Sequence, residues 1–390
     1  MTEEPLPDLI CFSHLRWNFV YQRPQHLMTR HSGRVFYFEE PVYSDHAHDW
    51  LHLSRPVGTD ITIVTPNLSG TGSTSPVEQR LRNLLDRLMT DENIITYMTW
   101  YYTPMALKFT SHLRPILLVY DCMDELSNFK FAPPELRALE AELFQKADIV
   151  FTGGKHLYSV KKKFHSNIFA FPSSIDQGHF RQSRKNLPQP THQASIARPR
   201  LGYYGVIDER LDIALVDSVA RKRPDWQIIL VGPVVKIDPA SLPQRQNIHY
   251  LGQKTYEDLP YYLSGWDIAI MPFALNEATE FISPTKTPEY LCGGKRVIST
   301  AIVDVVNDYG ADGLVDIVGN ADEFIKKSEI LLASRGYDQW LERVDKKLAT
   351  LSWDRTWRSM ASLIMSTRDH KFAPERPRLN KSSDQYSSYV

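Results

Sequence analysis

The chain has 390 residues, of which 42% are hydrophobic and 23% charged, and its formal net charge is -1 at pH 7. A chain of this length is too long for one ordinary hydrophobic core and predicts two domains. The near-neutral charge argues against nucleic acid as the main partner.

The cysteines and the N-terminus bear on the compartment. The cysteines, Cys11, Cys122 and Cys292, are isolated in apolar surroundings without metal-ligand spacing, so a reducing compartment is expected. The acidic first residues lack the apolar segment of a signal peptide. No run approaches the roughly 20 apolar residues needed to cross a bilayer. We expect a cytoplasmic protein, for which peripheral contact with the inner face of the plasma membrane stays open.

Short apolar runs alternate with helical patterns through the first half of the chain. Strands are expected at residues 9–13, 35–38, 61–64, 94–99, 116–120, 148–152 and 168–171. Helices are expected at residues 25–30, 77–89 and 136–146, from Pro104, and up to residue 163. This alternation predicts a parallel, doubly wound sheet, which places ligands at the carboxyl ends of its strands.

A second alternating set follows a segment rich in Pro, Gln and Ser. Its strands are expected at residues 201–204, 227–231, 248–250, 268–271, 297–299 and 314–317. Helices are expected at residues 212–221, 323–332, 340–348 and 353–365. We therefore expect a first domain at 1–185, a linker at 186–199, a second domain at 200–351, a last helix at 352–370 and a disordered tail at 371–390.

The segment 283–299 has the features of an anion site. Ser283 is placed to cap a helix and Pro284 to occupy its first turn. Lys286 and Glu289 are three residues apart and share one face. Amides at a helix start and a lysine attract phosphate oxygens, and a carboxylate one turn later can accept hydrogen bonds from ribose hydroxyls. An ordinary capped surface helix is the alternative.

The order and spacing of several fragments resemble those of retaining GT-B glycosyltransferases of the glycosyl transferases group 1 (family 4-like). The fragments that carry the resemblance are 171–176, 202–205, 247–252, 267–273, 283–286, 289–291 and 294–295. Residues 22–27 and 120–124 are similar to those of a subgroup linked to surface polysaccharide synthesis. The resemblance implies two Rossmann-like domains facing each other across a cleft, with a C-terminal helix that crosses back to the first domain.

The resemblance also implies an activity. A sugar, such as a hexose, would pass from a nucleotide-diphosphate sugar, with UDP as the expected nucleotide, to a carbohydrate or lipid-linked glycan with retention of configuration. No cofactor or metal is expected. Lys286 and Arg210 would stabilise the leaving diphosphate, at about 3 kcal/mol for each such contact. The residues expected to bind the donor are Gly205, Arg210, Gly232, Ser283, Pro284, Thr285, Lys286 and Glu289.

Two departures from the family pattern leave other functions open. Phe281 stands where many members carry a carboxylate, and Arg210 is the one basic residue in the loop after Gly205. A nucleotide-sugar 2-epimerase on the same fold and a non-catalytic nucleotide-sugar-binding protein are therefore the alternatives. Acceptor dependence would separate the first from a transferase, and loss of turnover in Lys286 and Glu289 variants would exclude the second.

The first domain should supply the acceptor side. Asp121 and Asp124 follow a strand end and are the candidate catalytic acids, with turn capping and solvation as the structural alternatives. The residues expected to contact the acceptor are His14, Arg16, Trp17 and Tyr101. Packing in the interior is the alternative for both aromatic residues. A basic cluster could be a solvated face or touch anionic lipid, and it consists of Lys155, Lys161, Lys162, Lys163 and His165.

Overall fold

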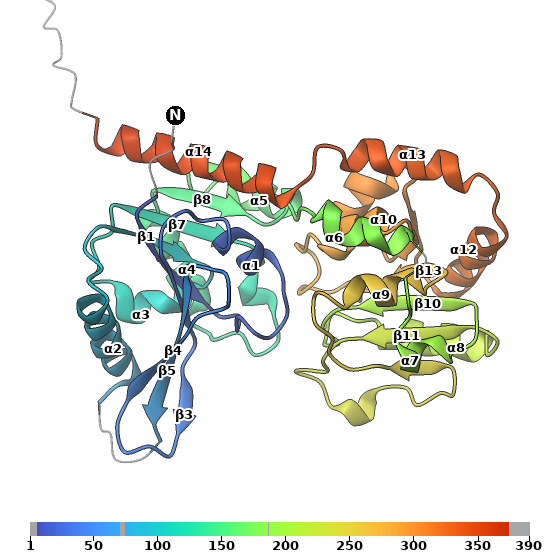
Figure 1. Cartoon of the computed structure of the whole chain (residues 1–390), viewed down its shortest axis with the longest axis horizontal. Coiled ribbons are helices and arrows are strands. Elements are labelled where there is room, and N and C mark those ends of the chain that lie inside the picture. Colours follow the sequence, from blue (N-terminus) through green and yellow to red (C-terminus); the bar gives the residue numbers. More distant parts are fainter. Residues whose placement is uncertain (1–5, 71–74, 186, 374–390) are drawn as a thin grey trace, which may run out of the picture.

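The computed structural model describes residues 6–70, 75–185 and 187–373. Two α/β domains lie side by side, each built on its own sheet (Figure 1). The two sheets have separate hydrophobic cores. This is the expected arrangement of two doubly wound domains.

The first sheet has the strand order β3-β5-β2-β1-β6-β7-β8-β9, with β4 paired to β5. Its strands are β1 (Asp8–Ser13), β2 (Val35–Glu39), β3 (Val42–Ser44), β4 (Trp50–Ser54), β5 (Ile61–Ser69), β6 (Tyr97–Tyr101), β7 (Leu117–Cys122), β8 (Ile149–Thr152) and β9 (Ile168–Ala170). The helices around it are α1 (Arg23–Met28), α2 (Val77–Asp91), α3 (Leu107–Thr110), α4 (Leu136–Lys146) and α5 (Lys155–Lys161). Each face of the sheet buries one apolar cluster.

Strands β3 and β4 were not expected from the sequence. Strand β5 runs past the end of β2, and the added length pairs with β3 on one edge and β4 on the other. The β4–β5 pair is antiparallel, so the expectation of a purely parallel sheet is wrong there. The signal was weak because β4 is largely exposed and carries little apolar alternation.

The second sheet is wholly parallel, with the order β12-β11-β10-β13-β14-β15. Its strands are β10 (Arg200–Tyr204), β11 (Gln227–Val231), β12 (Ile248–Tyr250), β13 (Ile268–Met271), β14 (Arg296–Ser299) and β15 (Val315–Ile317). The helices are α6 (Gln177–Arg181), α7 (Thr191–Ala194), α8 (Ile213–Lys222), α9 (Leu259–Ser264), α10 (Lys286–Cys292), α11 (Val303–Val305), α12 (Ala321–Ala333) and α13 (Tyr337–Leu348). Short 3-10 turns lie at Pro104–Ala106, Leu126–Asn128, Gln182–Arg184 and Pro239–Ser241, and a π-helical turn at Val306–Gly310.

The chain enters the second domain earlier than expected. Strand β9 still belongs to the first sheet, but Ile175 and Phe180 already pack in the core of the second domain. The predicted boundary at residue 185 is therefore too late. Phe180 lies in the short helix α6 and Ile175 just before it, and the periodicity of so short a segment is too brief to read from the sequence.

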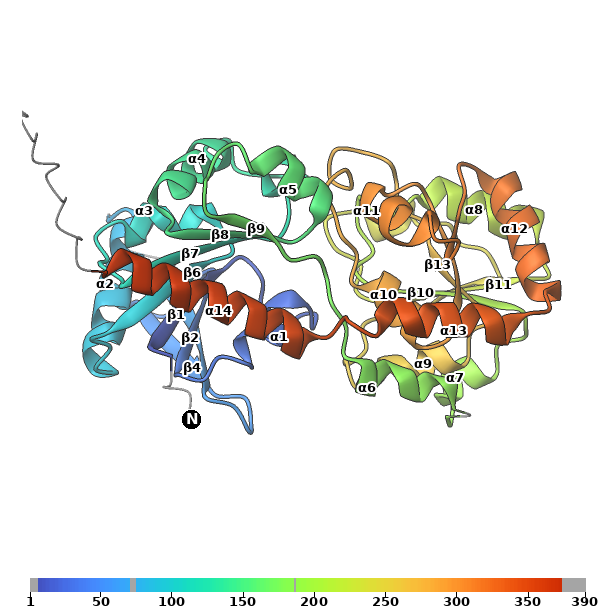
Figure 2. The same cartoon turned by 90° about the horizontal axis from the view of Figure 1, so that it is seen from above.

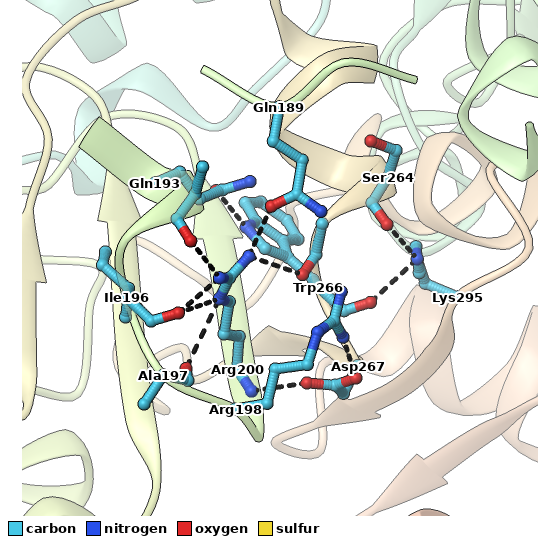
Figure 3. Close-up of polar contacts among 12 residues, drawn as sticks. Gln189, Gln193, Ile196, Ala197, Arg198, Arg200, Ser264, Trp266, Asp267 and Lys295 are labelled. Atoms are coloured by element: carbon cyan, nitrogen blue, oxygen red, sulfur yellow. Dashed lines mark hydrogen bonds and ion pairs between the residues drawn. The ribbon is translucent and has the colours of Figure 1, made fainter. Parts of the chain in front are cut away.

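The segment predicted as a linker is anchored to the second domain over its described part, residues 187–199. The guanidinium of Arg200 donates to the carbonyls of Ile196 (2.8 Å) and Ala194 (3.1 Å) (Figure 3). The amide of Gln193 accepts from the indole of Trp266 at 3.0 Å and donates to the Tyr262 carbonyl at 3.0 Å. These buried bonds hold the segment on the domain surface, so it is not a free linker.

The last helix, α14 (Trp353–Lys371), leaves the second domain and lies across the first (Figure 2). Trp353, Trp357, Met360 and Ile364 pack in one core cluster of the first domain. Ser352 caps the helix by accepting from the Arg355 amide at 3.2 Å. The expected return of the C-terminal helix is confirmed. Most of the predicted disordered tail, residues 374–390, lies outside the described residues.

Candidate active site

A cavity of about 100 Å³ lies between the two domains. The first domain contributes the loop before α1, and the second contributes the carboxyl ends of β10 and β11 and the start of α10. Six of the residues expected to bind the donor line this cavity, namely Gly205, Arg210, Gly232, Thr285, Lys286 and Glu289. Residues far apart in the sequence thus meet at one place, as expected for doubly wound sheets.

Two glycines make this meeting possible. Gly205 and Gly232 have φ angles of +144° and +151°, which favour glycine. A Cβ on Gly205 would lie 2.2 Å from Cε of Lys286, and one on Gly232 would lie 1.9 Å from the Gly205 carbonyl oxygen. Larger residues would therefore push Lys286 away from the end of β10.

Lys286 and Glu289 face the cavity from α10 and have shifted pKa values. Burial lowers the pKa of Lys286 to about 8, with the charge of Arg210 adding to the effect. Burial raises the pKa of Glu289 to about 7, although the Tyr204 hydroxyl donates to its carboxylate at 2.8 Å. Near neutral pH the carboxyl group can therefore either donate or accept a hydrogen bond.

The start of α10 differs from the expectation. The helix begins at Lys286, and Thr285 rather than Ser283 precedes it, without a side-chain cap. The Ser283 carbonyl instead accepts from the Ser173 hydroxyl at 2.6 Å, which ties this segment to the crossing between the domains. Ser283 and Pro284 line a second cavity next to the first.

Arg210 is held in place by its own loop. Its guanidinium makes a two-pronged contact with Asp208, with hydrogen bonds of 2.7 Å and 3.0 Å. The Asp208 carboxylate raises the pKa of Arg210, so the side chain stays charged. The guanidinium also lies 5.5 Å from the ring centroid of Phe129, which belongs to the first domain. Arg210 lines both cavities.

The second cavity, of about 80 Å³, contains one carboxylate among its described lining residues, that of Asp124. Burial raises the pKa of Asp124 to about 6, against the lowering effect of Arg210, Arg23 and Lys286. A carboxylate with this pKa can exchange a proton near neutral pH. It is therefore the acidic group of the first domain that the geometry favours for chemistry.

Asp121 was expected to face the cleft but lies in the interior of the first domain. It is fully buried and accepts two hydrogen bonds of 2.9 Å from Arg23, which is also buried. Arg23 donates further to the Phe171 carbonyl at 2.6 Å. The bidentate pair occupies both Asp121 oxygens, and Asp121 lines neither cavity, so the geometry favours a role in holding Arg23 and the catalytic role stays a prediction.

The expected acceptor residues do not form one group. Trp17 is buried and packs edge-on against Tyr37 at 5.0 Å, which agrees with the alternative of interior packing and not with an open ring for the acceptor. Tyr101 is 1% exposed, its hydroxyl donates to Thr110 at 2.8 Å, and it lines neither interdomain cavity, so its predicted place in the acceptor groove is corrected. Both rings are held by interior packing that the sequence left as the alternative.

His14 and Arg16 stay near the cleft. Burial lowers the pKa of His14 to about 4, with a contribution from Lys236 of the second domain. Arg16 is partly exposed and pairs with Glu39 at 3.0 Å. Neither lines the two cavities, and their acceptor role stays a prediction.

The structure explains the motif at residues 22–27. Gln25 is fully buried and fixes the preceding loop by donating to the Trp17 carbonyl at 2.7 Å and accepting from the Gln22 amide at 3.0 Å. The imidazole of His26 stacks on Trp353 of α14 at 4.6 Å. The motif therefore shapes the cavity wall and docks the last helix.

Sequence reasoning missed the aromatic contact across the cleft. Tyr21 of the first domain stacks on Tyr256 of the second at 4.4 Å, and both line the larger cavity. No local sequence pattern predicts such a pair, because Tyr21 and Tyr256 lie in two irregular loops. Gln22 and Arg23 line the second cavity. Both belong to the motif at residues 22–27, so the sequence did contain a signal for them.

Phe281, just before the donor fragments, and Lys295, within them, serve other purposes. Phe281, where a carboxylate was expected, stacks on His156 of the first domain at 5.0 Å. Lys295 donates to the carbonyls of Ser264 (3.0 Å) and Trp266 (2.8 Å) and lines neither cavity. Burial lowers the pKa of Lys295 to about 8. The resemblance at these two positions thus does not extend to the site.

The basic cluster on α5 is mostly engaged in other contacts. Lys161 is buried and pairs with Glu125 and Glu140, each at 2.7 Å. Lys155 pairs with Asp308 of the second domain at 2.5 Å. Within the described ranges, no helix has the length and apolar content needed to cross a membrane. Only part of the predicted lipid-facing surface is therefore available.

The part of the chain that the structure describes contains no group of three or more His, Cys, Asp or Glu side chains that could hold a metal ion. Independence from metals stays a prediction.

Comparison with solved structures identifies the class of fold. "Sucrose-phosphate synthase (tll1590) from Thermosynechococcus elongatus" has a TM-score of 0.65 and 13% identity, over 93% of this chain and 99% of that one. "Anabaena Alr3699/HepE in complex with UDP" has a TM-score of 0.62 and 13% identity, over 93% and 100%. "Trehalose-6-phosphate from E. coli bound with UDP-2-fluoro glucose" has a TM-score of 0.64 and 11% identity, over 93% and 99%. The chain has the GT-B fold.

One curated relative narrows the resemblance. The chain is 23% identical over 278 residues to "Putative teichuronic acid biosynthesis glycosyltransferase TuaH" of Bacillus subtilis (strain 168), covering 67% of this chain and 70% of that protein. No protein-family model matches the chain. The resemblance to GT-B glycosyltransferases linked to surface polysaccharides is thereby confirmed.

Proposed function

We propose that this protein is a glycosyltransferase that moves a sugar, such as a hexose, from a UDP-sugar to a carbohydrate acceptor. The observation that carries the proposal is the interdomain cavity in which Lys286, Arg210 and Glu289 converge beside two close-packed glycines. Cations and a carboxylate in one cavity suit a nucleotide diphosphate. A UDP complex and a UDP-2-fluoro glucose complex among the structural neighbours support UDP as the nucleotide.

The donor would lie on the second domain. Lys286 and Arg210 carry the positive charge that a diphosphate needs, and Gly205 and Gly232 leave its oxygens room beside the backbone. Glu289, with a pKa near 7, can hydrogen-bond a ribose hydroxyl in either protonation state. Ser283, Pro284 and Thr285 border the adjoining cavity, where the sugar would lie.

The chemistry proposed is transfer with retention. The bond between the anomeric carbon and the diphosphate oxygen breaks, and the acceptor oxygen forms a bond to that carbon on the same face. The acceptor proton passes to the departing phosphate oxygen or to Asp124, whose raised pKa suits this role. Lys286 and Arg210 stabilise the charge on the leaving group, so no metal or cofactor is required.

The acceptor would enter along the first domain. A glycan or lipid-linked glycan destined for surface polysaccharide is supported by the curated relative, whose name refers to teichuronic acid biosynthesis. Lys162 and Lys163 are exposed on the first domain and could contact an anionic membrane surface. A cytoplasmic place with peripheral contact at the inner face of the plasma membrane is part of the same proposal.

A thermal-shift titration tests the donor proposal. UDP and UDP-sugars should raise the melting temperature, because a ligand at 100 times its Kd adds about 2.7 kcal/mol to stability. Lys286→Ala should abolish this shift, and Lys326→Ala, which removes an exposed lysine from α12, should retain it. A wild-type protein that no nucleotide diphosphate stabilises would contradict the proposal.

Turnover separates the transferase from its alternatives. Sugar transfer that requires an acceptor supports the proposal, whereas UDP release with an epimerised sugar and no acceptor would indicate the epimerase. Binding of UDP-sugars without turnover under any acceptor would indicate a binding protein. Glu289→Gln should weaken donor binding in the first case without unfolding the domain.

A further inference from the structure

A third cavity, of about 460 Å³, lies where the chain crosses between the two domains. The chain crosses twice, at residues 171–176 after β9 and at residues 349–352 between α13 and α14, and the two crossings lie close together (Figure 2). The side-chain amide of Gln177 joins them by donating to the carbonyls of Leu348 (2.7 Å) and Leu351 (2.8 Å). We name this space the hinge cavity, and its polar lining includes Lys155, Ser174, Asp308, Lys347, Arg355 and Ser359.

Positive charge predominates in the hinge cavity. Asp308 is the one carboxylate among its described lining residues, and Lys155 of the first domain already pairs with it at 2.5 Å. Lys347 and Arg355 line the cavity in addition. The ion pair of Lys347 is with Asp312, at 2.7 Å, and Asp312 does not line the cavity. The lining therefore has an excess of cations, which favours an anionic ligand.

Arg355 is the cation that is free to bind such a ligand. Its backbone amide donates to the hydroxyl of Ser352 at 3.2 Å, but its exposed guanidinium forms no hydrogen bond or ion pair with any described residue. Thr356 and Ser359 line the cavity from the same side of α14, and the opposite face of this helix packs in the core of the first domain. A guanidinium flanked by hydroxyls suits a phosphate group, because its parallel N–H groups match two phosphate oxygens.

A buried hydroxyl on the other wall of the hinge cavity supports the same kind of ligand. Ser174 is 2% exposed, and its Oγ has no hydrogen-bond partner among the described residues. Buried hydroxyl groups in folded proteins are almost always hydrogen-bonded, since leaving one unpaired costs free energy. Ser174 lines the cavity next to Ser173, so an oxygen-rich ligand there can accept its hydrogen bond. This observation is independent of the charges on the opposite wall.

We propose that the hinge cavity binds a phosphate group, either free in solution or carried by a small sugar, at a site separate from the cleft. Arg355 and Lys347 would contact the phosphate oxygens, and Ser174 would donate a hydrogen bond to one of them. Among the described lining residues, the hinge cavity shares Ser173 alone with the two cavities of the cleft. The inference goes beyond the proposed function, because a phosphate at this place is neither the donor nor the leaving group.

Calorimetric titration of the full-length protein with inorganic phosphate and with glucose 6-phosphate tests this inference, with unphosphorylated glucose as the blank. Arg355→Ala should weaken binding by about tenfold, because it removes hydrogen bonds to a charged group. Ser174→Ala should weaken it by a smaller factor and leave the fold stable. Arg358→Ala is the matched control, because Arg358 is exposed on the same helix and does not line the cavity. Lys286→Ala, which removes a cation from the cleft, should keep phosphate binding.

The two probes distinguish the sources of the phosphate group. Tighter binding of glucose 6-phosphate would assign the site to a phosphorylated sugar, and equal affinities would assign it to free phosphate. Three results would overturn the inference: neither probe binds, Arg355→Ala binds as the wild type does, or Arg358→Ala loses binding equally. Phosphate binding that Lys286→Ala abolishes would do so too, because the phosphate would then lie in the cleft. A failure of UDP to bind would contradict only the proposed function, since none of these comparisons uses UDP.

Discussion

The two walls of the cleft are built in different ways. On the second domain the site residues come from strand ends and one helix, so their positions follow from local spacing: Gly205 directly follows β10, and Lys286 and Glu289 lie on α10. On the first domain the wall depends on pairs distant in the sequence, such as Arg23 with Asp121. The donor wall could therefore be read from the sequence more completely than the acceptor wall.

The difference also concerns what each wall does with its charges. The second domain keeps Lys286 unpaired by any carboxylate among the described ion pairs and exposes it to the cavity. The first domain neutralises Arg23 against Asp121 in the interior and leaves Asp124 to face the cavity. The comparison predicts that substitutions on the second wall alter binding and turnover, and that several on the first alter stability.

The largest effect is expected for Lys286→Ala. Removing the cation that faces the leaving group should lower kcat by about 10²–10³-fold, because such contacts act on developing charge. Steady-state kinetics measure the loss, and circular dichroism should show an intact fold. Lys326→Ala provides the control for removal of an exposed lysine. Unchanged turnover in Lys286→Ala would break the assignment of the donor wall.

Asp121→Asn should destabilise the first domain. The substitution leaves the buried guanidinium of Arg23 without its charged partner, and the expected loss is about 3 kcal/mol of unfolding free energy. Urea unfolding measures it. A stable Asp121→Asn variant that has lost turnover would instead restore Asp121 as a catalytic group.

Asp124→Asn should show the opposite pattern. Its carboxylate forms no ion pair with any residue that the structure describes and lines the second cavity, so turnover should fall by about 10²-fold while the unfolding free energy changes little. The pH profile of kcat should lose a titration near pH 6, which is the pKa of the buried Asp124. Equal kcat values for the variant and the wild type would leave the departing phosphate as the sole proton acceptor.

Binding of UDP should weaken as the pH rises through about 8. Lys286 binds its proton below its lowered pKa of about 8 and is neutral above it, so the attraction for the diphosphate is full below pH 8 and is lost above it. The ionisation of Glu289 near pH 7 acts in the same direction by adding a negative charge. The fall should reach up to about tenfold per pH unit. Calorimetric titrations from pH 6.5 to 9.5 measure it, and Lys286→Arg should flatten the profile because arginine stays charged.

The smallest effect is expected for Tyr101→Phe. The ring lies in the core and the change removes only the hydrogen bond to Thr110, so stability should fall by about 1 kcal/mol with an unchanged KM for the acceptor. Thermal unfolding and acceptor kinetics test the two parts separately. A raised KM for the acceptor would indicate that Tyr101 contacts the acceptor. It would also weaken the contrast between the two walls of the cleft.

Much of the fold could be predicted because it depends on local patterns. Buried runs such as residues 227–231 read as strands of a parallel sheet, and 353–365 read as an amphipathic helix. Strands β3 and β4 could not be predicted because β4 is largely exposed and, among the described strands, pairs with β5 alone. The domain boundary escaped because α6 is too short to show a period, although Ile175 and Phe180 decide where the chain crosses.

The sequence by itself determined the two alternating domains, the glycine turns and the placement of Lys286 and Glu289 on one helix, because each depends on neighbours within a few residues. Only the tertiary structure decided that Arg23 takes Asp121 out of the cleft, that Trp17 and Tyr101 enter the core, and that Tyr21 meets Tyr256. These outcomes depend on which distant groups compete for the same buried space and charge. A local sequence pattern cannot predict the result of that competition, because the competing groups are distant in the sequence.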